Sequence, residues 1–156
     1  MLSEVTLARL EGQLDGLRSS IARAQSEQWE RKPAPSKWSA RENLAHLARY
    51  HEVFLERLSR ILEAERPQFG RYRAEEDEEW PRWSSLDVAS LLGRIRGLRT
   101  QVIHQVSGLS DEQLTRTGLH PVLGEMDIPL WLEFFLLHEA HHLYAILFRL
   151  RDSSRT

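Results

Sequence analysis

No cysteine occurs among the 156 residues of this sequence. Disulfide bonds, zinc sites built from thiolates and a cysteine nucleophile are therefore all excluded. Any metal site in this chain has to use histidine, aspartate or glutamate side chains, and any reaction that needs a thiol has to take it from another molecule. The lack of cysteine also suits a reducing cytosol, so we expect a cytoplasmic protein.

Lysine is nearly absent, and long apolar runs are missing. Only Lys32 and Lys37 carry ammonium side chains, and the net charge is -2 at pH 7. A charge so close to neutral does not predict a nucleic-acid partner. No apolar run approaches about 18 residues without a charge, and the first residues lack the basic-then-apolar pattern of a secretory signal. We therefore expect neither a membrane span nor secretion.

Amphipathic helical patterns dominate the sequence. Apolar residues recur at intervals of three and four in four stretches, each of which predicts a helix. These stretches are residues 7–24, 39–64, about 84–106 and 127–150. Ser39 and Glu42 form a capping box at the start of the second stretch, and Asp127 is placed to cap the fourth. We predict an all-α fold, a four-helix bundle in one domain over residues 1–156 with a frayed tail over 151–156.

Two connections in this bundle have distinct compositions. Residues 65–83, between the second and third helices, are rich in charge, proline and aromatic side chains. We interpret them as a long crossover whose acidic run, 75–79, is solvated. Its aromatic residues are expected to pack on the bundle, with some of them lining a pocket. Residues 117–126 contain Gly118 and Gly124 and predict a loop or a short hairpin.

The most specific chemical motif is His138-Glu139-Ala140-His141-His142, in the fourth helix. On a helix, His138 and His142 project from one face and could bind one transition metal together. The motif fits the H-E-x-x-H signature of zinc proteases, but none of the 14 residues after it is a histidine or glutamate that could complete the site. It also fits the E-x-x-H pattern of di-iron bundles, but no second such pair is present. Both interpretations are therefore disfavoured.

A third ligand has to come from another helix, and His46 is the best candidate. It lies on the inward side of the second helix, where bundle metal sites are built. Three neutral imidazoles leave an open coordination position on a divalent metal. Among the other histidines, we expect His51 to be a pocket wall or a structural residue. We expect His141 to flank the site or to support the ligands by hydrogen bonds, and His120 to overhang the site.

One combination of residues is typical of a known family. It consists of Lys32-Pro33-Ala34-Pro35-Ser36-Lys37-Trp38-Ser39, Glu42, Ala45-His46-Leu47, Gly118, Gly124 and His138-Glu139-Ala140-His141-His142-Leu143. In this combination the sequence resembles the DinB-like (YfiT-like) metalloenzyme superfamily over nearly its full length. The resemblance implies a four-helix bundle that binds a divalent metal, often nickel or zinc, through His46, His138 and His142. It also implies low-molecular-weight thiols as cofactors in the better understood branches.

The leading hypothesis is a metal-dependent enzyme that acts on a small molecule. In a transferase version, the metal would hold the thiolate of an external low-molecular-weight thiol. In a hydrolase version, it would activate water for attack on a polar bond. Glu139 directly follows a ligand, about 100° around the helix. We expect its side chain to be exposed, with support of the metal ligands as the alternative.

Two other interpretations remain open. A metal-stabilised bundle could form a homodimer or bind a ligand without catalysis. Trp131, Phe134 and Phe135 widen the apolar face of the fourth helix enough to mark a subunit interface. Alternatively, the histidines are structural and no metal binds. Metal content and metal-dependent turnover separate these interpretations.

Overall fold

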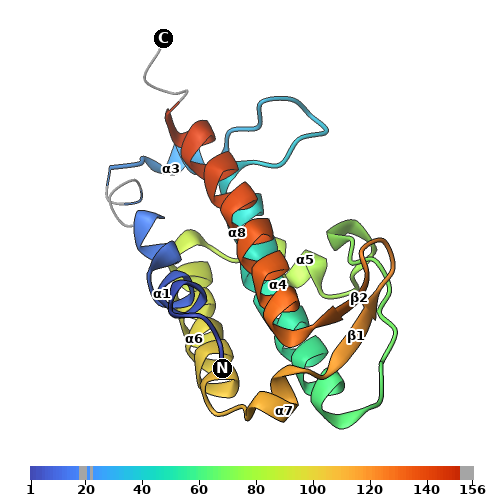
Figure 1. The fold of residues 1–156 in the computed structure, drawn as a ribbon. Helices are drawn as coiled ribbons and strands as arrows, with labels where there is room; N and C mark the ends of the chain where they lie inside the picture. Colours follow the sequence, from blue (N-terminus) through green and yellow to red (C-terminus); the bar gives the residue numbers. More distant parts are fainter. Residues whose placement is uncertain (18–20, 22, 152–156) are drawn as a thin grey trace.

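Long helices packed along one another form the body of the molecule (Figure 1). The computed structural model describes residues 1–17, 21 and 23–151. The four helices are α1 (Glu4–Gly12), α4 (Ala40–Glu63), α6 (Val88–Ser107) and α8 (Ile128–Arg151). Both α1 and α4 pack against α6 and α8. The predicted four-helix bundle is therefore confirmed. None of the helices in the described residues is long and apolar enough to span a bilayer.

Helices α4 and α8, the two longest, begin where their capping residues predict. The Ser39 hydroxyl accepts a hydrogen bond from the Glu42 N–H at 3.1 Å, and the Glu42 carboxylate accepts one from the Ser39 N–H at 2.8 Å. Asp127 Oδ1 accepts the N–H of Leu130 at 2.9 Å. Such caps satisfy N–H groups that have no partner inside the helix. They also fix the residue at which each helix begins, and so the face on which each histidine lies.

The first helix is shorter than predicted. The α-helix ends at Gly12, and the chain continues as the 3-10 helix η1 (Gln13–Leu17). Glycine weakens a helix by about 1 kcal/mol relative to alanine, and Gly12 and Gly16 lie at this change of helix type. Residues 18–20 and 22 of the predicted helix, and most of the predicted frayed tail (152–156), lie outside the described residues.

The third helix begins later than predicted. Its first residue is Val88 rather than one near Ser84 or Ser85. The capping side chain is that of Asp87, whose Oδ1 accepts the N–H of Ser90 at 2.8 Å. The remaining helical segments are short: α3 (Ser26–Glu30), η2 (Ala74–Glu76), α5 (Trp80–Ser84) and α7 (Asp111–Leu114).

A hairpin precedes α8. For residues 117–126 the sequence predicts either a loop or a short hairpin, and the structure has the hairpin. Strands β1 (Thr117–His120) and β2 (Gly124–Asp127) pair antiparallel, with His120 opposite Gly124. Gly124 has a φ of 79°, a left-handed conformation that favours glycine. The crossover is attached to this hairpin, because the Phe69 N–H donates to the Leu119 carbonyl at 3.1 Å and the Leu119 N–H donates to the Pro67 carbonyl at 2.9 Å.

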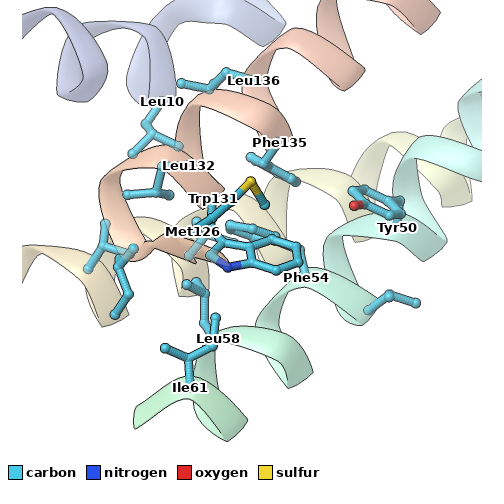
Figure 2. Packing of buried hydrophobic residues seen from close by; sticks show 14 of the residues in the cluster. Leu10, Tyr50, Phe54, Leu58, Ile61, Met126, Trp131, Leu132, Phe135 and Leu136 are labelled. Carbon is cyan, nitrogen blue, oxygen red and sulfur yellow. The ribbon is translucent and has the colours of Figure 1, made fainter. Parts of the chain in front are cut away.

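Aromatic side chains fill the core between α4 and α8 (Figure 2). Phe54 of α4 and Phe135 of α8 stack with their ring centroids 4.3 Å apart. Trp131 and Phe135 are 0% and 1% exposed, so the expectation that these two residues mark a subunit interface is wrong. Phe134 is only partly buried. The exposed large apolar residues of α8 are Leu130, Leu137, Tyr144 and Phe148.

Candidate metal centre

Three histidines from two helices converge in the bundle. His46 comes from α4, while His138 and His142 lie one turn apart on α8. One ring nitrogen from each lies within 4.8 Å of those of the other two. The Nε2 atoms of His46 and His138 are 3.0 Å apart. The packing of α4 against α8 therefore brings together residues that are about ninety positions apart in the sequence, as their placement on the two apolar faces predicts.

All three imidazoles are held in the neutral form. Burial lowers the pKa of His46 to about 4. Burial, followed by the nearby imidazoles and Arg149, lowers the pKa of His142 to about 3. The pKa of His138 falls well below its ordinary value, first through burial and then through the charges of His142 and His46. A neutral imidazole keeps a nitrogen lone pair, which is the form that binds a metal.

Asn43 orients one of these rings. Its Oδ1 lies 2.9 Å from His142 Nδ1, and its Nδ2 donates to the Ser39 carbonyl at 2.8 Å. Because the amide nitrogen is already used, Oδ1 is the acceptor and His142 Nδ1 carries the proton. The lone pair of His142 is then on Nε2 and free to bind a metal. The ring of Trp38 covers the same group, with its centroid 4.9 Å from that of His46.

The arrangement of the three rings fits a divalent cation. The Nδ1 atoms of His46 and His138 are buried and have no hydrogen-bond partner among the described residues. A cation bound by the facing Nε2 atoms would leave the proton of each of these rings on Nδ1 and its lone pair on Nε2, the nitrogen that faces the other ring. Three imidazoles with no carboxylate in the group match the nitrogen ligands that zinc and nickel accept.

Two tyrosines lie beside the histidines. The Tyr50 ring centroid is 4.2 Å from that of His138, and the Tyr72 centroid is 5.7 Å from that of His46. Tyr72 belongs to the crossover, and its hydroxyl donates to Asp77 at 3.1 Å. Asp77 in turn accepts a hydrogen bond from Arg49 at 2.7 Å. One acidic residue of the crossover thus fixes an aromatic residue over the site.

A cavity of about 410 Å³ opens beside two of the three histidines. This volume is typical of a small-molecule site. The lining contains two arginines and no aspartate or glutamate. The residues that line it are His46, Tyr50, Arg57, Arg71, Tyr72, His120, Val122, Leu123, Phe134 and His138.

The other histidines have distinct roles. His120 lines the cavity beside the three histidines. His51 is fully buried and structural, with its Nδ1 2.8 Å from the Leu47 carbonyl. It does not line the cavity. His141 is exposed and flanks His142, with ring centroids 5.1 Å apart.

The expectation that Glu139 is exposed is wrong. Its side chain is 0% exposed and accepts hydrogen bonds from Arg99 and, at 2.8 Å, from Gln13. The turn of about 100° from His138 directs Glu139 towards η1 and α6, where Gln13 and Arg99 lie, instead of towards solvent. Among the described residues, Glu139 forms no hydrogen bond with the three converging histidines.

Several residues of the site were missed from the sequence, among them Asn43, Tyr50, Arg57 and Arg71. Asn43 precedes His46 by three positions on α4, so the two share a face, and this spacing was the available signal. Arg57 continues the buried stripe of His46, Tyr50 and Phe54 at an interval of three. A charged residue on a buried stripe is the signal that could have identified it.

Comparisons with known proteins agree with this fold. A family model described as the DinB superfamily matches residues 9–146. The structure is similar to that of YfiT from Bacillus subtilis, with a TM-score of 0.82 and 20% sequence identity, and the match covers 100% of this chain and 92% of that one. YfiT is described as "a probable metal-dependent hydrolase with an unusual four-helix bundle topology". The four-helix bundle protein TT2238 is similar with a TM-score of 0.67 and 22% identity, covering 92% and 96%.

A third structure, a DinB-like protein (YjoA) from Bacillus subtilis, is similar with a TM-score of 0.62 and 15% identity, covering 98% of this chain and 94% of that one. The search of curated proteins gives no match. At these identities, the likeness to the solved structures establishes the fold alone.

Proposed function

This chain belongs to the DinB superfamily, and on that premise we propose that it is a metal-dependent enzyme that acts on a small molecule. The observation that carries the proposal is the convergence of three neutral imidazoles within 4.8 Å of one another. Two of them, His46 and His138, also line a cavity of about 410 Å³. A small molecule in that cavity would lie directly against the proposed ligands.

His46, His138 and His142 would hold the ion, and we propose nickel or zinc. When bound, a divalent ion would supply Lewis-acid chemistry, lowering the pKa of a water or thiol that reaches it. Asn43 keeps the His142 ring in the orientation that binding requires. Such hydrogen bonds to ligands tune metal affinity.

The cavity walls would bind and position the substrate. Burial raises the pKa of Tyr50, so its hydroxyl stays protonated at neutral pH. That hydroxyl accepts a hydrogen bond from Arg57 at 3.4 Å and keeps its own proton to donate to a substrate oxygen. The Tyr72 ring covers His46 and shields the centre from bulk water.

We propose hydrolysis as the reaction. The description of YfiT as a probable metal-dependent hydrolase supports this choice. A thiol-dependent transfer would use the same three histidines, but its thiol would have to be an external low-molecular-weight cofactor because the chain has no cysteine. The two reactions therefore differ in whether turnover requires an added thiol.

The first test is metal analysis of protein purified without a histidine tag. We expect one nickel or zinc ion per chain in the wild type, and its loss in His46→Gln and His142→Gln. His104→Gln is the matched control, because His104 is exposed on α6. Circular dichroism checks that each variant is folded. Full metal content in both ligand variants would overturn the proposed centre.

The second test is turnover by the metal-loaded protein. A panel of small esters and amides is incubated with and without low-molecular-weight thiols. Metal-dependent hydrolysis without thiol supports the proposal, while turnover that requires the thiol assigns transfer instead. A protein that binds metal stoichiometrically but turns over no substrate in either arm would be the non-catalytic bundle.

A further inference from the structure

Arg57 is a buried cation beside the candidate metal centre. Its side chain lies in α4, and the residue is only 7% exposed. The guanidinium donates to the Gly70 carbonyl at 2.9 Å and to the Tyr50 hydroxyl at 3.4 Å. It also packs over three aromatic rings, 5.9 Å from the centroid of Tyr50, 5.5 Å from Phe69 and 5.6 Å from Trp131. These contacts hold it rigidly in the cavity wall.

Arg57 has no carboxylate partner among the described residues. Both of its hydrogen bonds go to neutral oxygens, and no aspartate or glutamate lines the cavity. Arg99, which is also buried, is paired with Glu139. Because a buried charge is costly unless it is paired, the positive charge of Arg57 is suited to an anion that enters the cavity.

Two further donors line the same cavity. Arg71 is exposed and forms no ion pair within the described chain. His120 Nδ1 accepts the N–H groups of Val122 at 3.2 Å and Leu123 at 3.1 Å, so the ring proton is on Nε2. Burial, then the charges of Arg57 and Arg71, lower the pKa of His120 and keep it in this neutral form.

We propose that Arg57, Arg71 and His120 bind an anionic group of the substrate, a carboxylate or a phosphate. A planar guanidinium matches the oxygens of either group. Tyr50 contacts both Arg57 and His138, so the anion site and the metal centre share one wall. An anion held there would direct the rest of a small substrate towards the three histidines. This inference rests on the proposed function for its choice of substrate, but the anion site can be tested without turnover.

The test is calorimetric titration of the full-length protein with three probes of similar shape: benzoate, phenyl phosphate and benzamide. We expect both anions to bind about tenfold or more tightly than neutral benzamide. The tighter of the two anions identifies the group as carboxylate or phosphate. Equal affinity for benzamide and both anions would overturn the anion site.

Matched arginine variants locate the binding. Arg71→Ala should weaken anion binding by about fivefold and leave benzamide unaffected. Arg73→Ala is the control, since Arg73 is exposed, lies two residues away and does not line the cavity. Arg57→Gln should weaken anion binding by about tenfold or more. If the Arg57→Gln variant fails to fold, the comparison of Arg71→Ala with Arg73→Ala tests the anion site by itself. Equal effects of Arg71→Ala and Arg73→Ala would contradict the proposal.

The same titration after chelation separates this inference from the metal centre. Anion binding that persists in chelated protein and in His142→Gln supports the anion site even if the metal proposal fails. Benzoate binding that requires metal and is insensitive to Arg71→Ala would place the anion on the ion. That result would overturn the anion site and leave the metal centre standing.

Discussion

Arg99 and Glu139 form a buried ion pair at the centre of the bundle. The residues are 5% and 0% exposed, and Arg99 Nη2 donates to the Glu139 carboxylate. Arg99 Nη1 also donates to the Leu10 carbonyl at 2.8 Å, and Gln13 donates to the second Glu139 oxygen at 2.8 Å. Burial alone would raise the pKa of Glu139, but the adjacent His51 imidazole and the Arg99 charge hold it below its ordinary value. Through these hydrogen bonds the pair connects α6 and α8 to α1 and η1.

Removing one partner of this pair should be strongly destabilising. We expect Glu139→Gln to lower the free energy of unfolding by about 3–5 kcal/mol, because it leaves the Arg99 charge buried and unpaired. The double variant Arg99→Met/Glu139→Leu should lose less unfolding free energy than the sum of the losses caused by Arg99→Met alone and Glu139→Leu alone. Urea denaturation at pH 7 of each member of the cycle measures this. Glu79→Gln, which breaks an exposed ion pair with Arg82, should cost less than about 1 kcal/mol. Additive losses in the cycle would show that the two residues do not interact energetically.

Gly118 allows the hairpin to pack closely on α4. A Cβ added at this position would lie 2.8 Å from Phe69 Cε2 and 3.0 Å from Ile61 Cγ1. Gly118→Ala should therefore lower the free energy of unfolding by about 1–3 kcal/mol through overpacking. Gly97→Ala is the control, and its effect on stability should have the opposite sign. Gly97 is exposed within α6, and nothing lies within 4 Å of the added Cβ. That change should stabilise by about 0.5–1 kcal/mol. Thermal unfolding of both variants measures the contrast, and equal shifts would refute the close approach.

Asp77 should make the anchoring of the crossover dependent on pH. Burial alone would raise its pKa, but hydrogen bonds from Arg49, the Glu79 N–H and Tyr72 lower it below the ordinary value. A carboxyl with a lower pKa in the folded state contributes stability above its unfolded pKa of about 3.9, and that contribution is lost as the pH falls through the folded value. The difference in unfolding free energy between wild type and Asp77→Asn should therefore be constant above about pH 5 and shrink below about pH 4. Denaturation curves from pH 7 to pH 3 measure it, and a difference that grows on acidification would have the wrong sign.

Local sequence patterns predict the helices and the convergence of the three histidines, but not the charged groups inside the bundle. Periodicity places apolar residues inward, and His46 and His138 follow the same periodicity. Arg57, Arg99 and Glu139 also lie on the buried stripes of their helices. Their burial depends on partners from other segments: Arg99 of α6 pairs with Glu139 of α8, and Arg57 of α4 donates to the Gly70 carbonyl of the crossover. The pattern of one helix can mark such a residue as a charge on a buried stripe, but it does not identify the partner that another segment supplies.

The hydrogen bond between Asn43 and His142 should control metal affinity without supplying a ligand. Asn43 Oδ1 accepts from His142 Nδ1 at 2.9 Å, which fixes the ring and places its lone pair on Nε2. Asn43→Ala removes the acceptor, so we expect metal affinity to fall by about 10–100-fold. Asn43→Asp keeps an acceptor oxygen at the same position and should retain most of the affinity. Competition against a chromophoric zinc chelator measures both variants, and circular dichroism confirms that α4 is intact.

Gln105→Ala is the control for this prediction. It removes a different amide hydrogen bond, the one that Gln105 of α6 donates to Ser59 of α4 at 3.2 Å. It should leave metal affinity unchanged. If Asn43→Ala and Asn43→Asp lose affinity equally, the donor bond from Asn43 Nδ2 to the Ser39 carbonyl would be the important one, because both changes remove it. Rescue by aspartate alone assigns the effect to the oxygen that faces His142, since that is the group the two variants do not share.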